Sequence, residues 1–159
     1  MIAEVSNWKK GFDEYLLAGR ADTPRSVMRL LSLSPLECVR QRVAENVSAP
    51  HAVLRALSKD ADADVRIAIA HNSRTPSAVL SSLARDNNPD VRLAMAENPY
   101  LPLYVLSILA ADENPYVSQR ATKTIADAQA DRLKRLKAVL TDRIKSGVVE
   151  LLANAQPCA

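Results

Sequence analysis

Residues 65–86 read VRIAIAHNSRTPSAVLSSLARD, and residues 91–112 read VRLAMAENPYLPLYVLSILAAD. Residues 39–60, VRQRVAENVSAPHAVLRALSKD, match both segments. An internal period of this length is typical of stacked repeat architectures. The positions that recur every 26 residues are Val39, Val65, Val91 and Val117; Arg40, Arg66 and Arg92; Ala44, Ala70 and Ala96; Asn46, Asn72 and Asn98; Pro50, Pro76 and Pro102; Leu54, Leu80 and Leu106; Leu57, Leu83 and Leu109; Asp60, Asp86 and Asp112; and, in an earlier partial copy, Pro24, Met28 and Leu31.

The first half of each unit is expected to form a short helix. Asn88 and Pro89 are typical of the N-cap and the first turn of a helix, and Asp62 is the expected cap one unit earlier. The recurring asparagines, Asn72 and Asn98, are expected to end this helix in a left-handed conformation. Three glycines and 4% aromatic residues in the whole chain favour helix over sheet.

The second half of each unit is expected to form another helix. Thr75 and Pro76 are expected to cap and start it, as Thr23 and Pro24 do earlier in the chain. Within it, Val79, Leu80 and Leu83 make a single apolar stripe. Two such helices cannot bury their stripes alone, so the units are expected to stack into an all-α, right-handed helical-repeat solenoid.

These residues resemble the leucine-rich variant repeat, a relative of the HEAT repeats. The resemblance covers about residues 20–119 and implies two-helix units in a right-handed superhelix, with hardly any indication of function. One known member binds an iron–sulfur cluster through clustered cysteines. Such a cluster is not expected here, because the two cysteines, Cys38 and Cys158, are far apart; we expect a buried small hydrophobe and a free thiol in the tail. The pattern rests on Val65-Arg66, Ala70-His71-Asn72, Thr75-Pro76, Leu80, Leu83-Ala84 and Asp86, and on Val91-Arg92, Ala96-Glu97-Asn98-Pro99, Leu106, Leu109-Ala110 and Asp112.

The ends of the chain differ from the repeats of residues 21–119. Residues 1–20 are expected to form an N-terminal capping helix that covers the first repeat, with an apolar stripe of Val5, Trp8, Phe12, Tyr15 and Leu16. Residues 120–154 are expected to form a C-terminal amphipathic helix, followed by a tail, residues 155–159. We expect this helix to cap the array by folding back over Tyr100, Leu103, Tyr104 and Ile108. The alternative is a homodimer seam of Leu133, Leu136, Leu140 and Ile144.

Composition and charge limit the function classes. The chain has 159 residues and 48% hydrophobic residues, which predicts one domain with a core. No segment is typical of a signal peptide or a membrane span, so a cytoplasmic location is expected. Residues 1–119 hold 13 Lys and Arg against 14 Asp and Glu, whereas residues 120–159 hold 8 against 4. The basic charge therefore comes from the C-terminal segment.

No motif in the sequence predicts catalysis, a cofactor or a metal site. The two histidines, His51 and His71, do not have the spacing of metal ligands. The arginines at positions 40, 66 and 92 are candidate phosphate ligands. However, Asp60 lies six residues before Arg66, and Asp86 lies six residues before Arg92. A guanidinium group can bind carboxylates or free carbonyls at the ends of loops. We therefore expect these arginines to tie the units together.

The most informative positions are those at which the units disagree, because exposed positions are free to specialise. The favoured function is a non-catalytic scaffold for protein–protein interaction, monomeric or homodimeric and not membrane-bound. The alternatives are weak nucleic-acid binding through the basic C-terminal helix and a HEAT-type enzyme or enzyme subunit. The candidate partner-binding residues are Arg74, Tyr100, Leu103, Tyr104 and Ile108, and the candidate phosphate contacts are Arg132, Lys134, Arg135 and Lys137.

Overall fold

The computed structural model describes the backbone of residues 2–154 and the side chains of residues 10–141. Within the described backbone every element is a helix and no strand occurs, so the predicted all-α class is confirmed. The elements are α1 (Ile2–Gly19), α2 (Arg25–Leu31), α3 (Glu37–Glu45), α4 (His51–Leu57), α5 (Ala63–His71), α6 (Ser77–Leu83), α7 (Pro89–Glu97), α8 (Leu103–Ala110) and α9 (Pro115–Asn154). The predicted tail, residues 155–159 with Cys158, lies outside the described residues, as do the side chains of Val5, Trp8 and Ile144.

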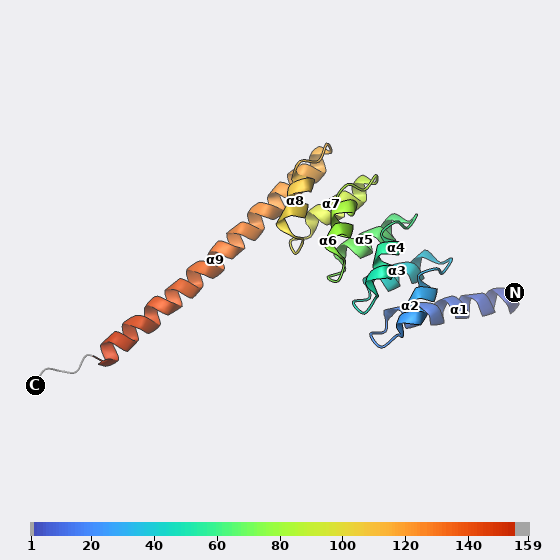
Figure 1. Cartoon of the computed structure of the whole chain (residues 1–159), viewed down its shortest axis with the longest axis horizontal. Helices are drawn as coiled ribbons and strands as arrows, with labels where there is room; N and C mark the ends of the chain where they lie inside the picture. The colour runs from blue at the N-terminus through green and yellow to red at the C-terminus, as the bar shows by residue number, and fades with distance from the viewer. Residues whose placement is uncertain (1, 155–159) are drawn as a thin grey trace, which may run out of the picture.

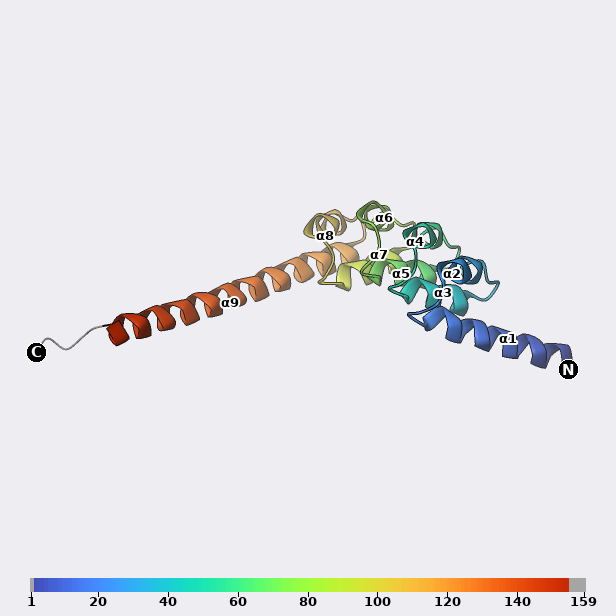
Figure 2. The ribbon, with the colours of Figure 1, turned by 60° about the horizontal axis from the view of Figure 1, so that its bottom comes forward.

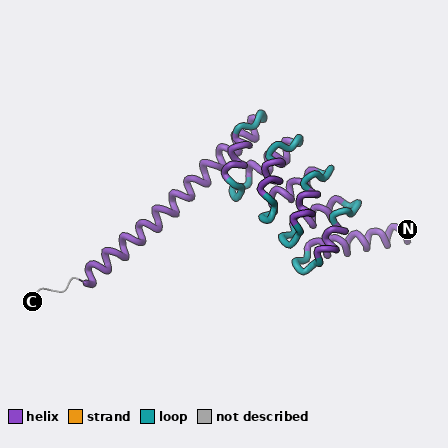
Figure 3. The backbone as a smooth tube through the Cα atoms, viewed as in Figure 1, coloured by secondary structure: helices purple, strands orange, loops and turns teal. Residues whose placement is uncertain are grey.

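The helices form two rows (Figure 1). The inner row contains α1, α3, α5, α7 and the start of α9, and each of these helices contacts the next. The outer row contains α2, α4, α6 and α8. Figure 2 shows the outer row above the inner row, with α1 and α9 sloping down from the two ends. The loops lie along two opposite edges of the array (Figure 3). Because α1 and α9 slope away on the side of the inner row in Figure 2, the inner row lies on the concave side.

The core lies between the two rows. The predicted stripe of α6 is buried, with Leu80 only 7% exposed, and its neighbours Val79 and Leu83 are buried with it. Met28, Leu54, Leu80 and Leu106, each 26 positions after the one before, are buried at equivalent places in α2, α4, α6 and α8. The apolar residues of one helix thus pack against those of the helices before and after it, which is how short helices of this kind gain a core.

The predicted starts of the inner-row helices are confirmed. The Asp62 carboxylate accepts hydrogen bonds from the Asp64 and Val65 N–H groups at 2.9 and 3.2 Å, and the Asn88 side chain accepts one from the Asp90 N–H at 2.8 Å. Pro89 follows as the first residue of α7. These caps satisfy N–H groups that have no partner within the helix.

The predicted left-handed helix ends are wrong. Asn72 has φ −71° and ψ 120°, which is extended. Its side chain has a different role, because Nδ2 donates to the Ala44 and Asn46 carbonyls at 2.6 and 3.1 Å, while Oδ1 accepts from the Arg74 N–H at 2.9 Å. Thr124 continues the series by donating to the Ala96 carbonyl at 2.7 Å. Asn72 therefore joins the end of α5 to the end of α3, and Asn46 joins the end of α3 to the end of α1 in the same way, through the Ala18 and Arg20 carbonyls.

The expected cap by Thr75 is also wrong. Pro76 occupies the N-cap position of α6 without a side-chain hydrogen bond. The Thr75 hydroxyl turns back and donates to the Ile69 carbonyl at 2.6 Å, and the Thr23 hydroxyl donates in the same way to the Leu17 carbonyl. The threonine thus satisfies a carbonyl at the end of the preceding helix, where helices leave acceptors unpaired.

The N-terminal helix packs against the array through its C-terminal end. Ala18 is fully buried, and α1 contacts α3 and α2, whereas Phe12 and Leu16 stay about half exposed. Gly19 permits a close approach, because a Cβ there would lie 2.5 Å from Arg42 Nε. The expectation that Cys38 is buried is wrong, since its side chain is exposed at the start of α3.

The C-terminal helix does not fold back, so that prediction is wrong for the described side chains. The start of α9 packs on α7 and α8 and buries Val117, Ala121 and Thr124. Beyond Ile125 it continues as one straight helix away from the array (Figure 1). The sequence offers no break, because Pro115 and Gly147 enclose 31 residues without proline or glycine, the residues that most readily end or kink a helix.

Candidate partner-binding surfaces

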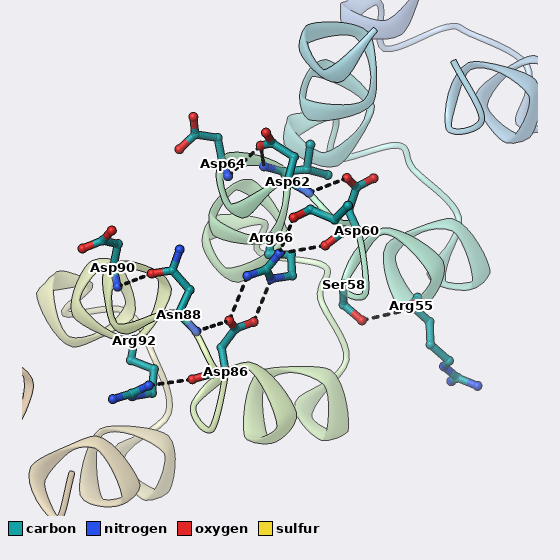
Figure 4. A network of polar contacts seen from close by, with 12 residues as sticks. Arg55, Ser58, Asp60, Asp62, Asp64, Arg66, Asp86, Asn88, Asp90 and Arg92 are labelled. Carbon is teal, nitrogen blue, oxygen red and sulfur yellow. Dashed lines mark hydrogen bonds and ion pairs between the residues drawn. The ribbon is translucent and has the colours of Figure 1, made fainter. Parts of the chain in front are cut away.

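The recurring arginines are occupied by structural contacts (Figure 4). Arg66 donates from Nε and Nη2 to the two Asp86 carboxylate oxygens at 2.8 and 2.9 Å, and from Nη1 to the Asp60 carbonyl at 2.8 Å. The predicted structural role is confirmed, although the carboxylate partner lies 20 residues after the arginine and the aspartate six residues before it contributes its carbonyl. The same contacts form a series, the Arg–Asp ladder, of Arg40–Asp60, Arg66–Asp86 and Arg92–Asp112.

The ladder aspartates are held in their charged form. Burial raises the pKa of the Asp86 carboxyl, but the hydrogen bonds from Arg66 and from the Asn88 N–H outweigh it, and the pKa lies below its ordinary value. The Arg66 pKa is raised, first by the hydrogen bond to Asp86. These guanidinium groups have their donors directed at protein acceptors, so the ladder supports the fold and is not a site for phosphate.

The predicted partner-binding patch is only partly brought together. Tyr100 lies in the loop before α8 and is 94% exposed, and Leu103 and Tyr104 are exposed in the first turn of α8. The Tyr104 hydroxyl donates to the Ser77 carbonyl of α6 at 3.3 Å. Ile108 is separate from these side chains, because it packs against the core and lines a hollow with residues of the α6–α7 and α8–α9 loops. Arg74 is exposed in the loop before α6.

The C-terminal helix presents both candidate phosphate contacts and uncovered apolar side chains. Arg132, Lys134, Arg135 and Lys137 are all exposed, and Lys134 forms an ion pair with Asp131 at 3.4 Å. The apolar residues Leu133, Leu136, Val139 and Leu140 are between 52% and 59% exposed. A run of large apolar residues that remains this exposed is typical of a surface that another molecule covers.

The structure reveals a further surface, which we call the inner face and define as the solvent side of α3, α5 and α7. A hollow of about 250 Å³ between α3 and α5 is lined by Gln41, Glu45, Asp64, Ile67, Ala68 and His71, together with Asn72. Ile67 and Ala68 are its apolar residues. The equivalent positions of α7 are held by Leu93 and Ala94, so the apolar strip continues along the row.

Carboxylates border this apolar strip on both sides. Asp64 and Asp90 lie in the first turns of α5 and α7, and Glu45 and Glu97 lie in the last turns of α3 and α7. Glu45 pairs with Arg42 at 2.9 Å and Glu97 with Arg120 at 3.6 Å, whereas Asp64 and Asp90 have no ion pair with a described residue. The strip is therefore apolar in the middle and acidic at its edges.

The outer row has the opposite charge. None of its helices, α2, α4, α6 and α8, contains Asp or Glu. Arg25, Arg29 and Arg55 are exposed on α2 and α4, and Lys59 and Arg85 are exposed just after α4 and α6. Residues 1–119 thus have almost no net charge because the acidic residues of the concave side nearly balance the basic residues of the convex side.

A signal for the inner face is present in the sequence. At positions 41, 67, 93 and 119 the residues are Gln, Ile, Leu and Gln, so the units disagree there as they do in the outer-row helices. Sequence reasoning compared the second helix of each unit and missed these positions of the first helix. An apolar pair flanked by two glutamines in equivalent positions marks a strip that packing alone does not require.

The chain matches none of the family models, curated proteins or solved structures with which it was compared. Within its described part, no helix combines the length and the apolar content that crossing a bilayer requires. The described side chains also include no group of three or more His, Cys, Asp or Glu arranged to hold a metal ion.

Proposed function

We propose that this chain is a non-catalytic protein-binding scaffold whose inner face receives a basic amphipathic segment of its partner. The proposal includes the architecture, a right-handed α-solenoid of 26-residue units that resembles leucine-rich variant and HEAT repeats. The recurrence of the Arg–Asp ladder at equal spacing supports that architecture. Solenoids present extended concave surfaces to their partners.

The single observation that carries this proposal is the apolar strip with acidic edges on the inner face. Ile67 and Leu93 offer apolar area in the middle, and Asp64 and Asp90 offer carboxylates without an ion pair at one edge. Apolar area contributes most of the affinity of such a surface, while charges at its rim select the partner and accelerate association. The partner chemistry that fits is an apolar stripe flanked by Lys or Arg.

Capture from native cell extract tests the proposal when paired variants are compared. Ile67→Gln with Leu93→Gln removes the apolar strip with the residue type that positions 41 and 119 already carry. Leu30→Gln with Leu33→Gln is the matched control, because both leucines are more than two thirds exposed outside the inner face. We expect the wild type and the control to retain the same proteins after nuclease treatment, and the inner-face variant to lose them. Equal retention by all three proteins would refute the inner face as the site.

Nucleic-acid binding is a second candidate, because the outer row lacks carboxylates and the C-terminal helix is basic. Arg55 and Arg85 on the convex side and the four basic residues of α9 could contact phosphates. Binding of this kind rests on counterion release, so the affinity should fall steeply as salt rises. Fluorescence anisotropy of a labelled oligonucleotide at several salt concentrations measures how steeply the affinity falls with salt. The double substitution Arg55→Gln with Arg85→Gln should make this fall less steep. The enzyme alternative has no supporting arrangement of described side chains, and we do not propose it.

A further inference from the structure

We propose that the inner face of one chain receives the C-terminal helix α9 of a second copy. This inference rests on the proposed function and names its partner. It starts from residues 126–141, in which every side chain except that of the half-buried Ala128 is exposed. At about 100° per residue, Leu133, Leu136 and Leu140 fall within about 60° of one another, with Arg132 and Lys137 on either side of them. The helix thus carries an apolar stripe with basic edges.

The chain cannot cover this stripe with its own inner face. Val117, Ala121 and Thr124 fix the start of α9 against α7 and α8. The same helix then continues through residues 126–141 without proline or glycine, so the stripe is carried away from the array by a straight rod (Figure 2). A fold-back would need at least one helical turn to unwind, and no residue there favours that. The surface that covers the apolar stripe of α9 must therefore come from another molecule.

The inner face has the complementary chemistry and length. Its apolar residues Ile67 and Leu93 lie between acidic edges, whereas the helix has leucines between basic edges. Residues 126–141 span about 24 Å at about 1.5 Å per residue. The axes of α3, α5 and α7 cover roughly 16–20 Å, at about 8–10 Å between packed helices. One copy of the exposed helix segment therefore reaches across the whole inner face.

Pairing of two α9 helices is the competing arrangement, and the charges oppose it. Four basic residues lie within the six positions from Arg132 to Lys137, next to the leucines that would form the seam. A parallel pair, or an antiparallel pair centred on Leu136, brings the two clusters together. The like charges of two basic clusters that lie side by side destabilise the pair of helices. The inner face avoids this repulsion, since Asp64 and Asp90 offer carboxylates that have no ion pair with a described residue.

Sedimentation of the full-length chain with two complementary variants tests the inference. The first variant, Ile67→Gln with Leu93→Gln, loses the receiving surface; the second, Leu133→Gln with Leu136→Gln, loses the inserted helix. Leu30→Gln with Leu33→Gln is again the matched control. We expect the wild type and the control to self-associate and each of the first two variants to be monomeric. An equal mixture of these two variants should form a complex, because one supplies an intact inner face and the other an intact α9.

Three results would overturn the inference. The first is a monomeric wild type at every concentration reached. The second is self-association of the inner-face variant alone, which indicates pairing of two α9 helices. The third is the absence of complexes in the mixture. In each case capture of other proteins that depends on Ile67 and Leu93 would leave the proposed function standing, and capture that is insensitive to them would remove both.

A charge variant keeps the test valid if the glutamine variants fail to fold, as circular dichroism would show. Asp64→Asn with Asp90→Asn changes two exposed side chains that contribute nothing to the core. We expect at least a tenfold weaker self-association for this variant, and added salt should weaken the wild type in the same direction. Unchanged self-association of Asp64→Asn with Asp90→Asn would contradict the proposed role of the acidic edge.

Discussion

Replacing Asp86 by alanine removes the acceptor of three hydrogen bonds at once. Two come from the Arg66 guanidinium group and one from the Asn88 N–H, at 2.8 to 2.9 Å. The side chains of Arg66 and Asp86 are only 14% and 10% exposed, so water cannot readily replace the lost carboxylate. The substitution therefore leaves a mostly buried guanidinium group without its counter-charge.

The expected cost follows from that geometry. Removing one partner of a buried ion pair destabilises a protein by about 3–5 kcal/mol. Arg66 keeps its hydrogen bonds to the Asp60 and Ala61 carbonyls, so we expect the lower end of the range, about 3 kcal/mol. Asp86→Asn retains an acceptor for the Asn88 N–H and should cost about 1.5 kcal/mol, the value of one hydrogen bond to a charged group. Removing both partners, with Arg66→Met and Asp86→Ala, should cost less than the sum of the single changes.

Urea unfolding followed by circular dichroism at 222 nm measures these differences without adding salt that screens charge. Asp127→Ala is the control, because Asp127 is an exposed carboxylate on α9, and it should change the stability by less than about 0.5 kcal/mol. A cost below about 1 kcal/mol for Asp86→Ala would reduce the pair to the value of an ordinary hydrogen bond. That result, or strict additivity in the double variant, would refute the idea that the ladder ties neighbouring helices together.

Three further predictions follow from burial and charge. The folded-state pKa of the ladder aspartates lies below the ordinary value of about 3.9, so their stabilisation is present above that pH and is lost as the pH falls through the folded-state pKa. At pH values below about 4 the melting temperature should therefore fall, and it should fall less for Asp86→Asn than for the wild type. Leu80→Ala should cost about 2–5 kcal/mol in urea unfolding, and a cost under about 0.5 kcal/mol would contradict the core described above. Truncation after Ile125 removes no buried described side chain and should leave the stability of the monomer within about 0.5 kcal/mol in thermal melting; a loss of several kcal/mol would mean that α9 returns to the array in solution.

Features that depend on neighbouring residues in the chain were predictable from the sequence. The caps by Asp62 and Asn88 involve N–H groups two or three residues away, so composition and spacing were sufficient. The helix end at Asn72 was not predictable in the same way. Its extended conformation depends on hydrogen bonds to carbonyls 26 and 28 residues earlier, and a local rule for helix ends takes no account of those partners.

The exposure of individual side chains was predicted less well, although equivalent positions of the repeats in the sequence carry part of the information. Cys38 occupies the position held by Asp64 and Asp90 in the following units, and two carboxylates at equivalent positions indicate a side chain in water. The direction of α9 was harder to infer, because its apolar stripe is compatible with docking on its own array or on another molecule. The deciding observation is the unbroken helix after Ile125, which ties the position of the stripe to that of the buried first turns.

The polar ties between helices also bear on how the chain folds. The amide of Asn72 and the guanidinium of Arg66 bind partners no more than 28 residues away, and none of the described hydrogen bonds spans a longer stretch of sequence. Low contact order of this kind is associated with folding in microseconds to milliseconds, because little loop-closure entropy opposes each contact. A nucleus can form at any pair of neighbouring helices and grow in both directions. Amide hydrogens near the two ends should then exchange before those of α5, whose inner-row neighbours hold it on both sides.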